Sequence, residues 1–574
     1  MLGKLRIFAQ LSLYAKKYSM SFPPRRPNHP RPLHDRCQLN GSVLNQSAFL
    51  RGVSPRKVSG LQYQSDYQQN QTHFWRNLIF FVTLRQNSSK MEAAIIGREE
   101  EKRQLNNYIG SPQSEFVAIY GRRRIGKTFL VKEMFEGRFT FRMTGKEKAD
   151  TKEQLQNFHY ALSDLGAEID LPANWTEAFR MLSQHIERFG TDEPKILFFD
   201  ELPWLDSKGS HFVDALEYFW NNWAYYRNDI KLIVCGSATS WMLSHIINAR
   251  GGLHNRVTHQ INMMPFTLRE TELYFQSRNF PYERPEIMEC YMAIGGVAYY
   301  LSLFETDKSV SQNIETLFFR RNAELKGEFG KIYKSLFKRA EQHIAIVTAL
   351  AKKGSGMTRT EIMEQLDATN NGNLSTQLRE LEECEFIRSF VPFGKTKKNT
   401  MYQLIDPFTL FHFRFLDGRS SFPADYWPKL QLTPTYSNWC GYAFEILCLN
   451  HIEQIVKALG IDGMLTTPCS WTYRPTKAIL ESKDIDEDLK QGAQIDLLID
   501  RSDKTISLCE MKYAQGEYEI TKDYDAYVQQ RMIVFRKVTG TKKTLMPTYI
   551  TPFGLTNNMY SRRLPRQVIA EAMF

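Results

Sequence analysis

F-V-A-I-Y-G-R-R-R-I-G-K-T, residues 116–128, is the stretch that decides the fold of this chain. Its first five residues are the short apolar run of a buried parallel strand. Gly121 and Gly126 permit the backbone torsions that turn successive N–H groups toward phosphate oxygens. A helix expected to begin near Lys127 adds the positive end of its dipole. The stretch therefore predicts a P-loop in an α/β domain with a parallel sheet.

The residues of this loop have the chemistry that ATP and Mg²⁺ require. Lys127 is expected to reach the β- and γ-phosphates, and Thr128 is expected to offer its hydroxyl to Mg²⁺. The backbone of the other loop residues is expected to surround the phosphates. These residues are Gly121, Arg122, Arg123, Arg124, Ile125 and Gly126. ATP and Mg²⁺ are therefore the predicted cofactors.

Two further apolar runs end in polar residues. K-I-L-F-F-D-E at 195–201 places Asp200 in the expected Mg²⁺ shell and Glu201 as the expected general base for the attacking water. Both acids could instead cap the next helix. K-L-I-V-C-G-S at 231–237 ends in Ser237, whose hydroxyl could lie between these carboxylates and the γ-phosphate, or could simply close the strand.

One arginine is a candidate for stabilising charge in the transition state. Arg256 ends the run G-G-L-H-N-R at 251–256, just before a polar–apolar strand. It could act within its own subunit or on a neighbouring subunit of a homo-oligomer. An ordinary surface arginine is the alternative.

More motifs accompany the loop between residues 91 and 340. They are I-I-G-R-E-E-E at 95–101, L-F-F-D-E at 197–201, C-G-S at 235–237, N-R at 255–256 before M-P-F, and G-G-V-A-Y-Y-L at 295–301. Together they resemble the archaeal and bacterial ATPase family within the AAA+/STAND group. The resemblance implies a P-loop ATPase core at 91–265, a helical lid at 266–340 and Ile96 beside the adenine. Ala298 stands where many members have proline.

Residues 341–415 have the pattern of a winged helix-turn-helix. Amphipathic pieces at 343–351, 358–366 and 372–384 precede two strands around the basic turn G-K-T-K-K-N, and Thr358 is a candidate N-cap. The third helix would read a DNA groove, and lysines of the turn would meet phosphates. That helix has three glutamates and one arginine, so a protein-contacting role stays open. The residues concerned are Arg379, Glu380, Glu382, Glu383, Lys395, Lys397 and Lys398.

A Pro/Tyr/Trp-containing linker, 416–434, precedes a C-terminal domain at 435–574. Its helix at 441–451 has Glu445, its strand at 492–500 has Asp496, and its strand at 505–513 has Glu510 and Lys512 on one face. Asp496 and Glu510 could bind Mg²⁺ or Mn²⁺, with Lys512 orienting the nucleophile. The combination resembles the PD-(D/E)xK nuclease superfamily, which implies a small α/β restriction-endonuclease-like domain. A surface of charged strand residues is the alternative.

The charge of the chain is uneven. The 574 residues have a net charge of +11, but residues 1–90 contain fourteen Lys/Arg and two Asp, so the rest is near neutral. The basic pI is therefore no argument for nucleic-acid binding by the folded part. Residues 1–90 could be a disordered basic arm, a targeting peptide or an over-extended gene start, and we favour the last.

The eight cysteines form no C-x-x-C pair, and no run of about 18 apolar residues occurs, so a cytoplasmic chain with no membrane span is expected.

These patterns lead to one functional hypothesis and one alternative. The hypothesis is that ATP binding and hydrolysis control a C-terminal, metal-dependent DNA nuclease. The alternative is a STAND-type regulatory switch whose C-terminal domain only binds a partner. DNA would be contacted through the winged helix and the C-terminal domain.

Overall fold

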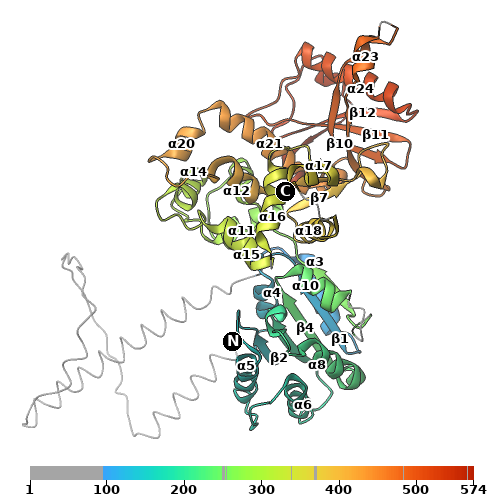
Figure 1. The fold of residues 1–574 in the computed structure, drawn as a ribbon. Helices are drawn as coiled ribbons and strands as arrows, with labels where there is room; N and C mark the ends of the chain where they lie inside the picture. Colours follow the sequence, from blue (N-terminus) through green and yellow to red (C-terminus); the bar gives the residue numbers. More distant parts are fainter. Residues whose placement is uncertain are drawn as a thin grey trace, which may run out of the picture. The chain divides into compact units, whose positions relative to one another are not determined.

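The computed structural model describes residues 95–248, 253, 255–337, 339–367, 371–482, 484–564 and 566–574 (Figure 1). The expectations about residues 1–90 lie outside these ranges. Among the helices in these ranges, none is both long and apolar enough to cross a membrane.

The first domain contains a five-stranded parallel sheet in the order β2-β3-β4-β1-β5 (Figure 1). Apolar side chains along the central strands alternate between two hydrophobic clusters, one on each face. Because both faces are covered, the strands read as continuous apolar runs, as predicted. The strands are β1 (Glu115–Tyr120), β2 (Phe139–Thr144), β3 (Lys195–Asp200), β4 (Ile230–Gly236) and β5 (His259–Asn262).

Helices cover the two faces of this sheet. Leu105 of α3 and Leu130 of α4 belong to one hydrophobic cluster, and Trp175 of α6 belongs to the other. The helices are α3 (Glu99–Ile109), α4 (Lys127–Phe135), α5 (Thr151–Ser163), α6 (Trp175–Ile186), α8 (Phe212–Phe219) and the short α10 (Thr239–Met242). The P-loop lies between β1 and α4, where the sequence placed it.

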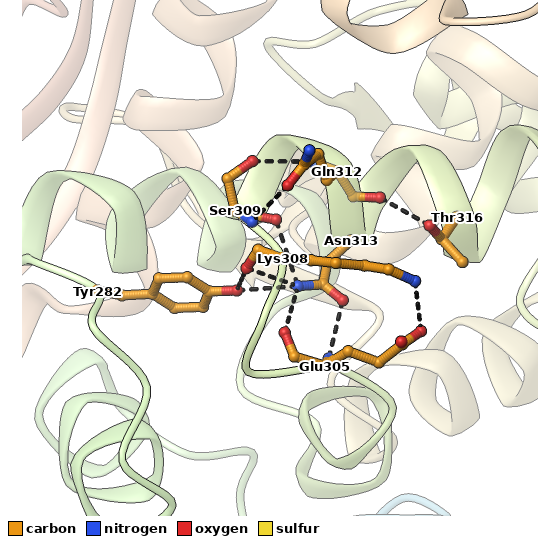
Figure 2. Close-up of polar contacts among 7 residues, drawn as sticks. All are labelled: Tyr282, Glu305, Lys308, Ser309, Gln312, Asn313 and Thr316. Atoms are coloured by element: carbon orange, nitrogen blue, oxygen red, sulfur yellow. Dashed lines mark hydrogen bonds and ion pairs between the residues drawn. The ribbon is translucent and has the colours of Figure 1, made fainter. Parts of the chain in front are cut away.

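A helical region follows where the lid was expected. It comprises α11 (Leu268–Ser277), α12 (Arg284–Ile294), α13 (Ala298–Ser302), α14 (Val310–Ile314) and α15 (Glu328–Leu336). Figure 2 shows how the buried amide of Asn313 fixes the turn before α14. Its two N–H groups are surrounded by Tyr282 Oη, 2.9 Å from the nitrogen, and by three carbonyl oxygens, and its oxygen accepts from Glu305 N at 2.9 Å. A buried amide with its hydrogen bonds satisfied holds a loop in one conformation.

Residues 340–404 form three helices and a small antiparallel sheet in the order β6-β8-β7. Thr358 caps α17, accepting from Glu361 N while Glu361 accepts from Thr358 N, so the predicted N-cap is confirmed. The elements are α16 (Ala340–Ala351), β6 (Met357–Thr358), α17 (Arg359–Gln365), α18 (Asn371–Glu383), β7 (Ile387–Phe390) and β8 (Met401–Leu404). The three helices, β7 and β8 correspond to the elements that the sequence predicts, whereas the short strand β6 was not predicted.

The segment expected to be a linker is partly packed. It contains α20 (Tyr426–Leu430), whose Trp427 is fully buried and stacks on Phe319 with ring centroids 5.6 Å apart. Trp427 also lies against Trp439 of α21. Burying an indole of this size removes a large apolar area from water, so the segment is held against the helical region.

The C-terminal domain has a mixed sheet in the order β13-β12-β11-β10-β9. Pairs β9/β10 and β10/β11 are antiparallel, whereas β11/β12 and β12/β13 are parallel. One face packs with α21 and the other with α24. The elements are α21 (Pro434–Asn450), α22 (Ile452–Ala458), β9 (Thr466–Tyr473), β10 (Ala493–Arg501), β11 (Thr505–Met511), α24 (Lys522–Thr539), β12 (Thr544–Thr551) and β13 (Arg566–Ile569).

Candidate functional site

A cavity of about 540 Å³ opens beside the P-loop. Its walls come from the segment before α3, the loop itself, the residues that follow β3 and β5, and helices α11 and α13 of the helical region. Its lining includes Ile95, Ile96, Arg98, Arg123, Arg124, Ile125, Gly126, Lys127, Thr128, Glu201, Phe266, Tyr274, Arg278, Ala298 and Tyr299. Ile96 and most of the loop residues predicted to bind the cofactor therefore share one cavity.

The two loop glycines have backbone conformations that other residues rarely adopt. Gly121 has a φ of 133° and Gly126 a φ of 97°. A Cβ on Gly121 would overlap the carbonyl oxygen of Met263. Gly126 directly precedes α4, so the loop leads into the positive end of that helix.

Lys127 is buried at the base of the loop. Its ammonium donates to the carbonyl oxygens of Gly121 and Arg122, both at 2.8 Å. Burial lowers the pKa of Lys127, because a desolvated ammonium is unfavourable. A phosphate group offers this ammonium a stronger, charged acceptor than the two carbonyls.

Thr128 and Asp200 bring two kinds of hard oxygen together. Thr128 Oγ1 lies 3.0 Å from Asp200 Oδ1 and 2.9 Å from Oδ2, and it donates to this carboxylate. Burial raises the pKa of Asp200, and a nearby cation would reverse that effect. Hydroxyl and carboxylate oxygens fit Mg²⁺, so these residues are suited to the ion that the sequence predicted.

Glu201 meets Ser237 at the ends of neighbouring strands β3 and β4. Ser237 Oγ donates to Glu201 Oε2 at 2.8 Å, and Ser237 N lies 3.3 Å from the same oxygen. Glu201 has a φ of 47°, a left-handed conformation that is costly for a residue with a side chain. The structure thus brings together Asp200, Glu201 and Ser237, as expected, with Ser237 holding the Glu201 carboxylate.

The three loop arginines extend in different directions. Arg122 is buried outside the cavity, and its Nη1 lies 2.6 Å from Asp406 Oδ1. Arg123 lies over the ring of Trp204. The backbone of Arg122 is part of the P-loop, but its side chain points away from the cavity in which the cofactor is expected, so only its backbone can contribute to cofactor binding.

The third loop arginine contacts the lid. Arg124 Nη1 lies 2.5 Å from Glu328 Oε1, and its guanidinium lies 4.2 Å from the ring centre of Tyr299. The Tyr299 amide donates to the Arg124 carbonyl at 3.1 Å. The G-G-V-A-Y-Y-L turn, with Ala298 in place of proline, thus holds the loop from the lid side.

Comparisons with known proteins agree with this geometry. Residues 95–304 match the family model described as an ATPase domain predominantly from Archaea. These residues are a P-loop ATPase domain. An uncharacterized protein of Methanocaldococcus jannaschii is 23% identical over 451 residues, which span 76% of this chain and 92% of the relative.

Solved structures with lower similarity include two archaeal proteins. The Walker-type ATPase of Pyrococcus abyssi has 20% identity, covers 56% of this chain and 96% of its own, and gives a TM-score of 0.43. The ORC2 protein of Aeropyrum pernix has 14% identity, covers 62% and 93%, and gives 0.36. The C-terminal domain lies outside the matched range 95–304.

Arg256 does not line the nucleotide cavity of the ATPase domain. It is exposed, and its guanidinium lies 5.7 Å from the ring centre of Tyr225. A role in its own subunit is not supported by this position. A role toward a neighbouring subunit stays a prediction.

Helix α18, the candidate groove reader, packs against α10 of the ATPase domain. Its acidic residues have partners nearby: Glu380 Oε2 lies 2.7 Å from His343 Nε2, and Glu382 accepts from Ser389 N at 3.0 Å. This arrangement favours the protein-contacting role for α18.

The four acidic and basic residues singled out in the C-terminal domain lie in one region. The β10/β11 pairing that the structure gives starts at Leu497 and Cys509, and β10 shifts register against β9 between Ile495 and Leu498, so Asp496 lies at an irregular point of its strand. Lys512 Nζ lies 4.0 Å from Glu510 Oε2. Burial, and then the charge of Asp496, raises the pKa of Glu445 to about 8. The charges of Asp496, Glu510 and Lys512 all act on Glu445, so the four residues are neighbours, and their joint action as a nuclease site stays a prediction.

Two residues that the sequence did not predict form hydrogen bonds to the Glu510 carboxylate. Arg531 of α24 donates to Oε1, and Tyr524 Oη donates to Oε2 at 2.6 Å. They are seven residues apart on one helix, a spacing that puts both on the same face. Among the described residues, no three His, Cys, Asp or Glu side chains are arranged to hold one metal ion. A divalent ion at Glu510 would have to share the carboxylate with Arg531 and Tyr524 or displace one of them, so the metal site at Asp496 and Glu510 stays a prediction.

Proposed function

We propose that this chain is an ATP-hydrolysing switch whose nucleotide state controls the C-terminal domain. The Arg122–Asp406 ion pair is the observation that supports it, because it links the P-loop directly to the segment after β8. Asp406 caps α19 (Pro407–Phe411), accepting from Thr409 N at 2.9 Å. Helix α19 packs on α21, which contains Glu445. A change in the conformation of the P-loop could therefore reach Glu445 through the Arg122–Asp406 ion pair, α19 and α21.

In the ATPase domain, each residue of the cavity has a proposed role. Lys127 and the loop amides bind the phosphates, and Thr128 and Asp200 hold Mg²⁺. Glu201 accepts the proton of the attacking water, and Ser237 keeps its carboxylate in place. These roles rest on the hydrogen bonds between Thr128 and Asp200 and between Ser237 and Glu201.

We propose the same domain limits as the sequence predicted, with 266–340 as a lid, 341–415 as a winged helix and 435–574 as the C-terminal domain. The packing of α18 on α10 supports a winged helix that reports on the ATPase domain. The C-terminal domain is proposed to be a metal-dependent DNA nuclease, supported by the clustering of Glu445, Asp496, Glu510 and Lys512. Mg²⁺ or Mn²⁺ there would supply a Lewis acid, and Lys512 would orient the nucleophile.

A second function is favoured by the contacts of Glu510. With Arg531 and Tyr524 on its two oxygens, the C-terminal domain could serve as a non-catalytic partner-binding module. A cleavage assay on labelled DNA with Mg²⁺ or Mn²⁺ separates the two functions. The nuclease proposal predicts cleavage that Asp496→Asn and Glu510→Gln abolish, with ATP hydrolysis retained. Absence of cleavage by the parent protein would leave the binding module.

A further inference from the structure

A second cavity, of about 460 Å³, lies between the segment 341–415 and the C-terminal domain. We call it the composite cleft, because both parts line it. Arg388, Phe390 and Lys395 come from the first part, and Tyr442, Glu445 and Asp496 come from the second. Two of the four predicted nuclease residues, Glu445 and Asp496, therefore line a cleft whose other wall comes from residues 341–415.

Two contacts hold the walls of the composite cleft together. The amide of Phe393 donates to the Ser470 carbonyl of β9 at 2.8 Å, and the Phe393 ring lies 5.2 Å from that of Phe535 in α24. A Cβ on Gly354 would come within 2.8 Å of the Tyr442 ring, so the turn after α16 also fits closely against α21. The turn expected to contact DNA is thus docked on the C-terminal sheet.

Arg388 brings a positive charge that lacks a carboxylate partner. Its Nε donates to Gln403 Oε1 at 2.8 Å, and its guanidinium lies 4.6 Å from the Phe390 ring centre. Burial lowers the pKa of Arg388 to about 10. Within the part of the chain that the structure describes, no ion pair is formed by this residue. Asp496 acts on this guanidinium from beyond ion-pair distance, and a desolvated guanidinium without a directly paired carboxylate is costly, which indicates a place for an anion.

A buried hydroxyl points to the same conclusion. Tyr442 Oη is buried and has no hydrogen-bond partner among the described residues. Such groups are rare unless a water or a ligand satisfies them. Lys395 and Arg474 are exposed and line the same cleft, which adds positive charge around Asp496.

We propose that the composite cleft binds an unpaired nucleic-acid strand, with a phosphate on Arg388 and Tyr442 and a base against Phe390. A guanidinium and a hydroxyl suit a phosphate, and an aromatic ring suits an unstacked base. The volume is in the range of small-ligand pockets, about 300–1,000 Å³, which admits an extruded nucleotide and excludes a duplex. Only the cleavage of that strand at Asp496 rests on the proposed nuclease function.

Binding is measured by fluorescence anisotropy with a labelled single-stranded DNA, an RNA of the same sequence and a DNA hairpin duplex. EDTA is present, so that binding is read without cleavage. The full-length chain should bind the single strands more tightly than the duplex. Arg388→Gln should weaken binding about tenfold or more, as loss of a charged hydrogen bond does, and should reduce the salt slope by about 0.7. Tyr442→Phe should weaken binding several-fold.

Arg180→Gln is the matched control. Arg180 is an exposed arginine of α6 outside the composite cleft, and its replacement should leave the affinity unchanged. Melting temperatures show whether each variant is folded. Equal affinity of folded Arg388→Gln and parent, a preference for duplex, or a loss confined to Arg180→Gln would overturn the inference. If binding follows this pattern but neither Mg²⁺ nor Mn²⁺ supports cleavage, the composite cleft is a nucleic-acid binding site and the nuclease proposal fails.

Discussion

Arg122 and Asp406 form an ion pair, with Nη1 and Oδ1 2.6 Å apart, although 284 residues separate them in the chain. Both side chains are almost fully buried, at 2% and 1% exposure. The guanidinium also lies 4.8 Å from the Phe386 ring centre. The phosphate-binding loop is therefore fixed to the region that leads into the C-terminal domain.

Asp406→Asn should destabilise the protein by about 3 kcal/mol or more, because it leaves the Arg122 guanidinium buried without its counter-charge. Chemical denaturation monitored by tryptophan fluorescence measures the change. Glu136→Gln is the control, since Glu136 pairs with Arg142 at 3.2 Å on the surface and should cost less than about 1 kcal/mol. Similar losses in the two variants would contradict a structural role for the buried pair.

Lys127→Ala should strongly weaken ATP binding, because it removes the ammonium that lies within the loop on the carbonyls of Gly121 and Arg122 and that would bind the phosphates. Isothermal titration calorimetry with ATP and Mg²⁺ measures the affinity. Lys152→Ala, which changes an exposed lysine of α5, should bind ATP like the parent. An unchanged affinity in Lys127→Ala would refute the assignment of the loop.

Glu201→Gln should retain ATP binding and slow hydrolysis by about 10²-fold or more, as loss of a general base does. Ser237→Ala should slow hydrolysis by a smaller factor, because Glu201 stays in place but loses the hydrogen bond that orients it. Steady-state phosphate release gives both rates. If Glu201→Gln hydrolyses ATP at the parental rate, Glu201 only caps the following helix.

Much of the nucleotide site could be predicted because its signals are local. Continuous apolar runs identify β1, β3 and β4, and the residues after each run lie at the same sheet edge. The pairings of Arg122 with Asp406 and of Arg531 with Glu510 could not be predicted, because they join distant segments. Trp427 likewise lies in a stretch with linker composition, and its burial depends on Phe319 and Trp439.

In the C-terminal site, one feature could be predicted from the sequence and another could not. That Asp496 and Glu510 lie on neighbouring strands could be predicted from the two apolar runs, but the register shift of β10 between Ile495 and Leu498 could not. The hydrogen bonds of Glu510 to Tyr524 and Arg531 depend on how α24 packs on the sheet, and the sequence pattern does not predict that packing.

Lowering the pH should destabilise the contact between the lid and the C-terminal domain. His451 Nε2 accepts from Leu268 N at 3.0 Å, and its Nδ1 donates to Leu447 O at 2.8 Å, which requires a neutral ring. Burial lowers the pKa of His451 from 6.5 to about 4. Because the unfolded state binds the proton more readily, stability is full above pH 6.5 and is lost as the pH falls toward 4.

Denaturation curves at pH 7 and pH 5 measure this effect. His412, whose pKa burial also lowers to about 4, adds to the fall in the parent. His451→Gln can still accept and donate, so its free energy of unfolding should fall less between the two pH values. An identical fall in parent and variant would exclude His451 as a source.

The most direct test of the account compares DNA cleavage in two nucleotide states. Labelled single-stranded DNA and Mn²⁺ are incubated with Glu201→Gln protein and ATP, which holds the bound nucleotide, and with the same protein and ADP. If the ATPase domain controls the C-terminal domain, the cleavage rates should differ several-fold between ATP and ADP. This difference should be smaller in the double variant Glu201→Gln/Asp406→Asn. Equal rates with ATP, with ADP and without nucleotide would contradict control of the C-terminal domain by the ATPase domain.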